Sequence, residues 1–210
     1  MLRVWRWIRV VLLAGLAAGV LGLAMLGHRE PSSPLRTMGS VPDQGLLPDF
    51  ALLDEYGTPF TRQRLEGRVT IAGFIFTRCA GQCPLITAAM AQLGTEFPQA
   101  SVMRLLAFSV DPAYDTPEVL RAYAKRLNAD PRRWSFVTGD PEVMNRLVRQ
   151  GFRLSLGPGA SPREPIAHSV RLALIDPRGH LRGTYDTTDA EAMSRLRQHV
   201  RTLLLEAASL

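Results

Sequence analysis

The chain contains only two cysteines, Cys79 and Cys83, which lie four residues apart directly before Pro84. Residues four apart on a helical turn lie on the same side, with Cα atoms about 6 Å apart. Two sulfurs placed in this way can chelate one soft metal ion, and the same separation lets them close a disulfide. Because a disulfide stabilises a fold less when its loop is short, this pair makes a poor structural crosslink. It indicates chemistry instead, either metal binding or thiol–disulfide exchange.

The strand and the helix expected on either side of the cysteines would favour their reactive thiolate form. Val69 to Phe76 is a continuous apolar run, typical of a strand buried on both faces. Pro84 suits the first turn of a helix that continues to about Phe97. Ligand sites of open α/β sheets gather at the carboxyl ends of strands, and a helix N-terminus favours thiolate over thiol. Thiolate is the form that binds metals and attacks disulfides.

His168 is the candidate third ligand. It lies between a Gly- and Pro-rich segment, 157–165, expected as a loop, and the apolar run 170–175, expected as a strand. In a thioredoxin-like sheet this loop faces the active-site helix, so the imidazole can complete a trigonal site with two thiolates. Such a donor set suits copper, as Cu(I) or Cu(II), better than magnesium or calcium, whereas a structural zinc site would need a fourth ligand. The other histidines are interpreted as structural: His28, His180 and His199.

Other residues near these motifs have ordinary structural interpretations. Asp111 and Asp115 are expected as a turn former and a helix-start residue, with a contact to the cysteine site as the alternative. Arg78 could favour the neighbouring thiolate by its charge, although an exposed arginine is the more common arrangement. The seven methionines show no spacing that suggests a copper cluster and are interpreted mostly as core filler.

Strands and helices are expected to alternate along the rest of the chain. A buried strand over 102–110 precedes a helix capped by Thr116, and a short strand over 135–137 precedes a helix capped by Asp140. A hairpin formed by 170–175 and 181–185 and a helix over 188–207 complete the order. This order predicts an α/β fold of the thioredoxin-like type, with a mixed central sheet flanked by helices.

The N-terminal segment differs from the rest. Arg3, Arg6 and Arg9 precede an uncharged apolar run, 10–27, at the short end of what crosses a bilayer. Charge before the run favours a cytoplasmic N-terminus. A cleaved signal peptide is the alternative, but no clear small-residue cleavage site closes the run. We expect a single-pass anchor in the cytoplasmic membrane at 1–27, a flexible linker at 28–46 and an extracytoplasmic (periplasmic) domain at 47–210.

The overall charge gives little support to nucleic-acid binding. The formal net charge is +6, of which the three leader arginines supply half, and no basic cluster is visible along the remaining sequence. No nucleic-acid partner is therefore expected.

Three blocks of the sequence resemble the SCO/SenC family of cytochrome c oxidase assembly factors. The blocks are Phe76-Thr77-Arg78-Cys79 through Cys83-Pro84, then Ser109-Val110-Asp111-Pro112 with Asp115-Thr116-Pro117, then His168-Ser169. Their order and spacing agree with the family, as does the expected anchor. One departure is Ala80, since family members often have proline directly after the first cysteine.

The resemblance implies a thioredoxin-like protein that binds copper through Cys79, Cys83 and His168. Such proteins help to metallate the dinuclear copper A centre of the oxidase, directly or by reducing its cysteines. The implied partners are the copper A subunit and other copper chaperones or thiol reductants. Three functions stay open: a metallochaperone, a thiol–disulfide oxidoreductase that uses Cys79 and Cys83 as a redox pair, and a copper or redox sensor.

Overall fold

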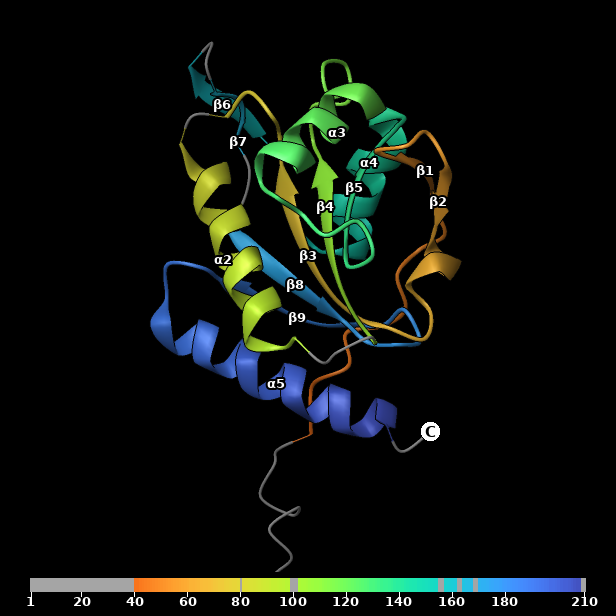
Figure 1. The fold of residues 1–210 in the computed structure, drawn as a ribbon, viewed down its shortest axis with the longest axis vertical. Helices are drawn as coiled ribbons and strands as arrows, with labels where there is room; N and C mark the ends of the chain where they lie inside the picture. Colours follow the sequence, from red (N-terminus) through yellow and green to blue (C-terminus); the bar gives the residue numbers. More distant parts are fainter. Residues whose placement is uncertain are drawn as a thin grey trace, which may run out of the picture. The chain divides into compact units, whose positions relative to one another are not determined.

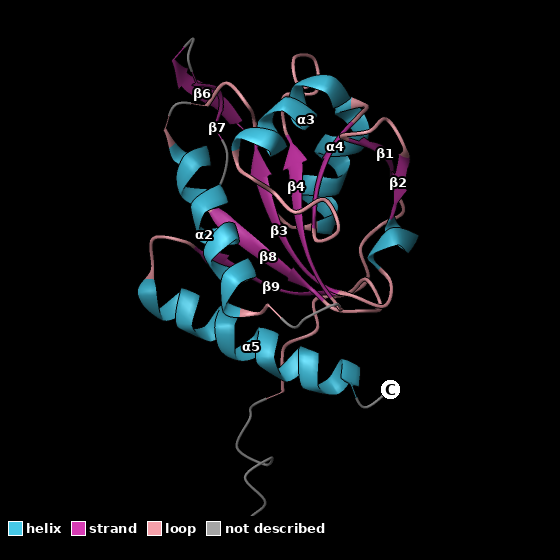
Figure 2. Cartoon of the chain, in the orientation of Figure 1, coloured by secondary structure: helices cyan, strands magenta, loops and turns pink. Residues whose placement is uncertain are grey.

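A seven-stranded mixed sheet with the order β2-β1-β5-β4-β3-β8-β9 forms the centre of the molecule (Figure 1). The computed structural model describes residues 40–79, 81–98, 102–154, 157–161, 164–167 and 170–208. Helices pack on the sheet, so the α/β class expected from the sequence is confirmed (Figure 2). The expected anchor at 1–27 lies outside the described residues. Within the described part, no helix has both the length and the apolar character needed to cross a membrane.

The central strands coincide with the apolar segments, so the strands predicted from the sequence are confirmed. β3 (Val69–Ile75) pairs in parallel with β4 (Met103–Ser109), and every residue of both strands is buried. β4 in turn pairs in parallel with β5 (Trp134–Thr138), as expected for strands joined by helical crossovers. On the other side of β3, β8 (Arg171–Ile175) is antiparallel and forms a hairpin with β9 (Leu181–Asp186).

The helices begin at the caps that the sequence predicted. α3 (Pro117–Arg126) has the Thr116 side chain as its N-cap, and α4 (Pro141–Arg146) has the Asp140 carboxylate. α4 continues as a π-helical turn, η3 (Leu147–Gly151). The other helices are α2 (Gln82–Glu96), α5 (Ala190–Ala208) and the short 3-10 helix η2 (Arg62–Leu65).

The two faces of β3 are covered by different helices. The space above Gly73 is filled by Ile86 and Met90 of α2. On the opposite face, Phe74 packs against Phe152, which follows η3, with ring centroids 4.9 Å apart. The strand is therefore held from both sides, and its carboxyl end has a fixed position relative to α2.

The Gly- and Pro-rich segment expected as a loop is instead a small hairpin. β6 (Gly157–Ser161) pairs with the antiparallel β7 (Glu164–Ala167) in a separate two-stranded sheet (Figure 1). The expectation of a loop was wrong because pairing of two adjacent segments needs only backbone groups, which glycine also supplies. A short edge pair, β1 (Ala51–Asp54) with β2 (Pro59–Thr61), extends the central sheet beyond β5.

The chain packs against the domain from Val41, inside the segment expected as a linker. Val41 is 3% exposed, and Arg182 donates hydrogen bonds to the carbonyls of Val41 and Pro42 at 2.5 and 2.7 Å. The His180 ring lies 2.9 Å from the Asp43 carboxylate. These contacts secure residues ahead of Leu47 to the β8–β9 turn.

Candidate functional site: a dithiol at the amino end of α2

The two cysteines lie where β3 gives way to α2, at the carboxyl end of the parallel strands (Figure 1). Cys79 is in the connecting loop, where its amide donates to the Phe76 carbonyl at 3.1 Å, and Cys83 is the second residue of α2. Neither is joined in a disulfide and both are buried, Cys79 at 8% exposure and Cys83 at 0%. Cys79 is therefore the more accessible residue of the pair.

Each sulfur accepts a backbone hydrogen bond. The Cys83 Sγ accepts from the Phe76 amide at 3.3 Å, and the Cys79 Sγ accepts from the Cys83 amide at 3.4 Å. The second bond uses one of the free N–H groups at the start of a helix. The sequence expectation that the pair would meet a helix N-terminus is thus confirmed for both residues.

Burial raises the pKa of the Cys83 thiol far above its usual value. The Phe76 amide lowers that pKa, whereas a hydrogen bond with the Cys79 thiol raises it again. Burial dominates because a thiolate at this depth loses its hydration. Cys83 is therefore a protonated thiol at neutral pH, and any metal or disulfide bond that it forms must release this proton.

Asp115 ties the cysteine loop to the segment after β4. This fully buried carboxylate accepts the Thr77 amide at 3.0 Å and the Thr77 hydroxyl at 2.5 Å. It also accepts the Ser109 hydroxyl at 2.6 Å, and the Ser109 oxygen in turn accepts the Asp111 amide at 3.2 Å. Three donors thus compensate the buried charge, and the loop that leads to Cys79 is held from the β4–α3 side.

Arg78 forms an ion pair with Asp111, so its charge is already balanced by a carboxylate and is not directed at the Cys79 thiolate alone. Its guanidinium donates to Asp111 Oδ2 at 2.5 and 3.2 Å and stacks over the Tyr114 ring, 4.4 Å from the centroid. The carboxylate also raises the pKa of Arg78. This pair forms a second bridge between the cysteine loop and the β4–α3 segment.

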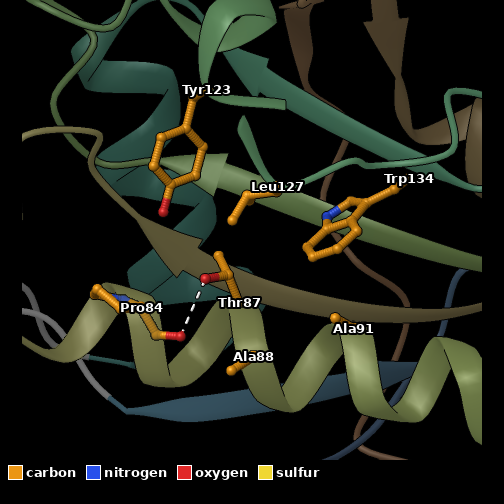
Figure 3. A pocket seen from close by; sticks show the side chains of 7 residues that line it. All are labelled: Pro84, Thr87, Ala88, Ala91, Tyr123, Leu127 and Trp134. Atoms are coloured by element: carbon orange, nitrogen blue, oxygen red, sulfur yellow. Dashed lines mark hydrogen bonds between the residues drawn. The ribbon is translucent and has the colours of Figure 1, made fainter. Parts of the chain in front are cut away.

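A shallow, mainly apolar hollow lies beside the first turns of α2 (Figure 3). Its volume is about 280 Å³, and it is lined by Pro84, Thr87, Ala88, Ala91, Tyr123, Leu127 and Trp134. The Thr87 hydroxyl donates to the carbonyls of Cys83 and Pro84 at 3.0 and 3.2 Å. Both carbonyls belong to the preceding turn of α2, so the Thr87 side chain stabilises the turn that carries Cys83.

The predicted ligands are only partly described. Cys79 and Cys83 lie together, but His168 lies outside the described residues, and so does Ala80. Among the described residues, no group of three or more His, Cys, Asp or Glu side chains could hold a metal ion. The structural interpretation is confirmed for two histidines: His180 pairs with Asp43, and His199 Nδ1 lies at hydrogen-bond distance, 2.6 Å, from the Tyr185 hydroxyl. His199 is half-buried, and His28 is outside the described part.

The roles of Asp111 and Asp115 were underestimated. The favoured interpretation made them local turn and cap residues, yet both contact the cysteine loop. Ser109 and Thr77 join the same network, although in the sequence they were named only as parts of the family-like blocks and given no role. A usable signal was present, because polar residues directly after a buried parallel strand point to the ligand-bearing edge of the sheet.

Comparison with known proteins identifies relatives over almost all of this domain. The SCO1/SenC family model matches residues 40–204. A protein of Stutzerimonas stutzeri that carries copper binding in its name is 30% identical, over 83% of this chain and 85% of its own length. The SCO1 protein homolog of Bacillus subtilis is 26% identical, over 82% and 86%.

Solved structures agree with the sequence relatives. The SCO1/SenC family lipoprotein of Bacillus anthracis superposes with a TM-score of 0.68 and 27% identity, covering 76% of this chain and 95% of its own. Yeast Sco1 with copper bound superposes with a TM-score of 0.60 at 24% identity, over 75% and 90%, which supports the fold. The thioredoxin-like architecture expected from the sequence is therefore confirmed. The family model covers the domain that carries the dithiol between β3 and α2 and the polar network from the β4–α3 segment. This chain therefore belongs to the SCO1/SenC family.

Proposed function

We propose that this protein binds copper through Cys79, Cys83 and His168 and delivers it to the dinuclear copper A centre of cytochrome c oxidase. The observation that carries the proposal is the buried, hydrogen-bonded dithiol at the amino end of α2. Two thiols and an imidazole form a soft donor set that suits copper. Copper is named in a Stutzerimonas stutzeri relative and in solved structures of yeast and plant members of the family.

The strand register supports His168 as the third ligand. β8 is antiparallel to β3, with Leu172 opposite Gly73, so the first residue of β8 lies beside the carboxyl end of β3. That end leads to Cys79, and His168 precedes β8 by three positions. The order of the chain along β8 therefore favours His168 as the residue that completes the site.

Copper binding by this site releases the thiol proton of Cys83. Because burial holds Cys83 in its thiol form, copper must displace that proton, and the affinity is expected to rise with pH. The protein's own contribution is positional. Asp115 and Arg78 hold the loop that carries Cys79, and the Phe76 amide stabilises the Cys83 sulfur once it is charged.

The expected anchor gives the proposed location. Residues 1–27 would hold the protein as a single-pass protein in the cytoplasmic membrane, with the copper site on the extracytoplasmic side. The copper A subunit of the oxidase, other copper chaperones and thiol reductants are the proposed partners.

A copper titration of the reduced full-length protein tests the proposal. We expect the native protein to bind one copper per chain. Its copper affinity should fall by about a hundredfold or more in each of the variants Cys79→Ser, Cys83→Ser and His168→Ala. His180→Ala is the matched control, since this histidine pairs with Asp43 and should leave copper binding unchanged. Binding that is indifferent to His168→Ala would refute the three-ligand site.

A second candidate function is the reduction of a partner disulfide. The arrangement of Cys79 above the fully buried Cys83 favours it, because the outer thiolate can attack and the inner thiol can resolve. Attack of Cys79 forms a mixed disulfide and expels one partner thiolate. Cys83 then displaces the second, which leaves a Cys79–Cys83 disulfide for an external thiol to reduce.

Complementation separates the two functions. If the protein delivers copper, His168→Ala should cause an oxidase defect that added copper relieves. If it reduces disulfides, His168→Ala should be tolerated, both cysteines should be required, and an external thiol should relieve their loss. A sensor would instead bind copper normally and leave oxidase metallation unchanged when deleted.

A further inference from the structure

At the end of the domain away from the cysteines, Arg104 lies near two arginines that are distant from it in sequence, Arg64 and Arg68. Arg104 is the second residue of β4, Arg68 directly precedes β3, and Arg64 lies in η2. The Arg68 guanidinium donates to the Arg132 carbonyl at 3.4 Å. The guanidinium carbons of Arg64 and Arg104 lie 4.9 and 5.5 Å from the centroid of the same Phe60 ring. Arg104 also donates a hydrogen bond to the Arg64 carbonyl. β3 and β4 start at this end and run toward the amino end of α2 (Figure 1).

The positive charge of this cluster is only partly balanced. Arg104 is 8% exposed. Of the three arginines, only Arg64 forms an ion pair within the described residues, with Asp54 at 3.0 Å. Burial, together with the charges of the neighbouring Arg68 and Arg64, lowers the pKa of Arg104 to about 10. A buried cation beside two other cations is unfavourable unless an anion compensates it.

A free hydroxyl lies next to the cluster. Thr70 pairs with Arg104 across β3 and β4, and directly paired residues project from the same face of a sheet. The Thr70 hydroxyl is fully buried and has no hydrogen-bond partner among the described residues. Buried hydroxyls in proteins are nearly always bonded, so this one indicates a missing polar neighbour.

We propose that Arg64, Arg68 and Arg104 form a binding site for a phosphate-class anion, supplied either by an anionic lipid headgroup or by free phosphate. Guanidinium groups recognise phosphate oxygens through paired N–H donors, and several converging arginines match its charge. The Thr70 hydroxyl can donate a further bond.

The path of the chain brings a lipid surface within reach. The Leu47 amide donates to the Gly179 carbonyl at 3.0 Å, and the Gly67 amide donates to the Pro177 carbonyl of the same turn at 2.9 Å. The segment before β1 therefore joins the domain close to this cluster. If the anchor ends near Gly27, the residues up to Val41 span at most about 50 Å. Headgroups bound here would hold the domain with its dithiol end directed away from the bilayer. The anion site itself does not depend on the copper proposal.

Thermal unfolding of the full-length protein in non-ionic detergent tests the site, with inorganic phosphate compared against chloride at matched ionic strength. We expect a saturable rise in the midpoint on the order of 5 °C for the native protein. The rise should be absent or much smaller in Arg104→Met, which keeps the packing on Phe60, and in Arg68→Gln. Arg146→Gln removes an exposed arginine of α4 and should respond like the native protein. If Arg104→Met does not fold, Arg68→Gln still decides the question.

A second arm separates the two sources of phosphate. Hydrogen exchange of the amides of residues 62–68 is compared in nanodiscs of phosphatidylcholine alone and with added phosphatidylglycerol. Slower exchange with phosphatidylglycerol, lost in Arg68→Gln, supports the lipid headgroup, whereas a response to phosphate alone supports the free anion. The proposal is overturned if neither arm responds, or if the native protein, Arg68→Gln and Arg104→Met respond equally.

Discussion

Removing the charge of Asp115 should loosen the loop that carries the outer cysteine. Asp115→Asn keeps the shape of the side chain, and the hydroxyls of Thr77 and Ser109 can rotate to bond the amide. The three hydrogen bonds, at 3.0, 2.5 and 2.6 Å, then lose their charge assistance. Charge-assisted bonds are about twice as strong as neutral ones, and each loss is about 0.5–1.5 kcal/mol. Since a buried charge is also removed, we expect a net loss of about 2 kcal/mol in the free energy of unfolding.

Two measurements test this expectation on the full-length protein in non-ionic detergent. Urea unfolding gives the loss of stability, and the rate of Cys79 alkylation by iodoacetamide reports access to the loop. Alkylation should become faster in Asp115→Asn because Thr77 no longer holds the loop firmly. Asp130→Asn is the matched control, since this exposed carboxylate pairs only with Arg132 among its described contacts, and both readouts should stay native.

Two results would contradict the reasoning in different ways. Native stability in Asp115→Asn would show that the carboxylate charge contributes nothing to the network. Reduced stability with unchanged Cys79 alkylation would show that the network supports the fold without positioning the cysteine loop.

Three other substitutions probe the fold itself, each by urea unfolding. Burial raises the pKa of Glu55, so the native protein loses stability as the pH rises through the folded pKa of this residue. Glu55→Gln should therefore have a larger free energy of unfolding than the native protein at pH 7 and an equal one near pH 4. A difference that stays constant with pH would contradict this. Gly73→Ala should lose about 1–3 kcal/mol, because the new Cβ would lie 2.8 Å from the Met90 sulfur and 3.0 Å from Ile86 Cγ2. Gly94→Ala in α2 should lose less, because its Cβ would meet only the end of the Leu105 side chain at 3.1 Å and alanine favours a helix. Equal losses would refute the packing argument. Asp140→Ala should lose about 1 kcal/mol with the N-cap of α4, and no loss would mean that the cap is dispensable.

Local sequence rules predicted most of the secondary structure because they depend on neighbours along the chain. The apolar runs at β3 and β4 correspond to strands buried on both faces, and the caps at Thr116 and Asp140 begin the helices they predicted. The same rules failed over 157–165, where composition indicated a loop and backbone pairing produced β6 and β7.

The cysteine pair could also be recognised from sequence, since four-residue spacing and the strand-to-helix transition are local features. The remainder of the site could not. The bonds from Asp115 to Thr77 and from Asp111 to Arg78 cross between two loops that are separated by α2 and β4. Only the parallel register of β3 and β4 brings the ends of those strands together.

Most elements, their order and a dithiol at a helix N-terminus could be predicted from sequence, because periodicity, capping and spacing act over a few residues. Which charges lie together depends on the assembled fold. Arg64 and Arg104 are 40 residues apart, yet the fold brings both guanidinium groups to the ring of Phe60 and buries Arg104. Burial and charge proximity depend on contacts between distant segments, so they arise only when the sheet is assembled.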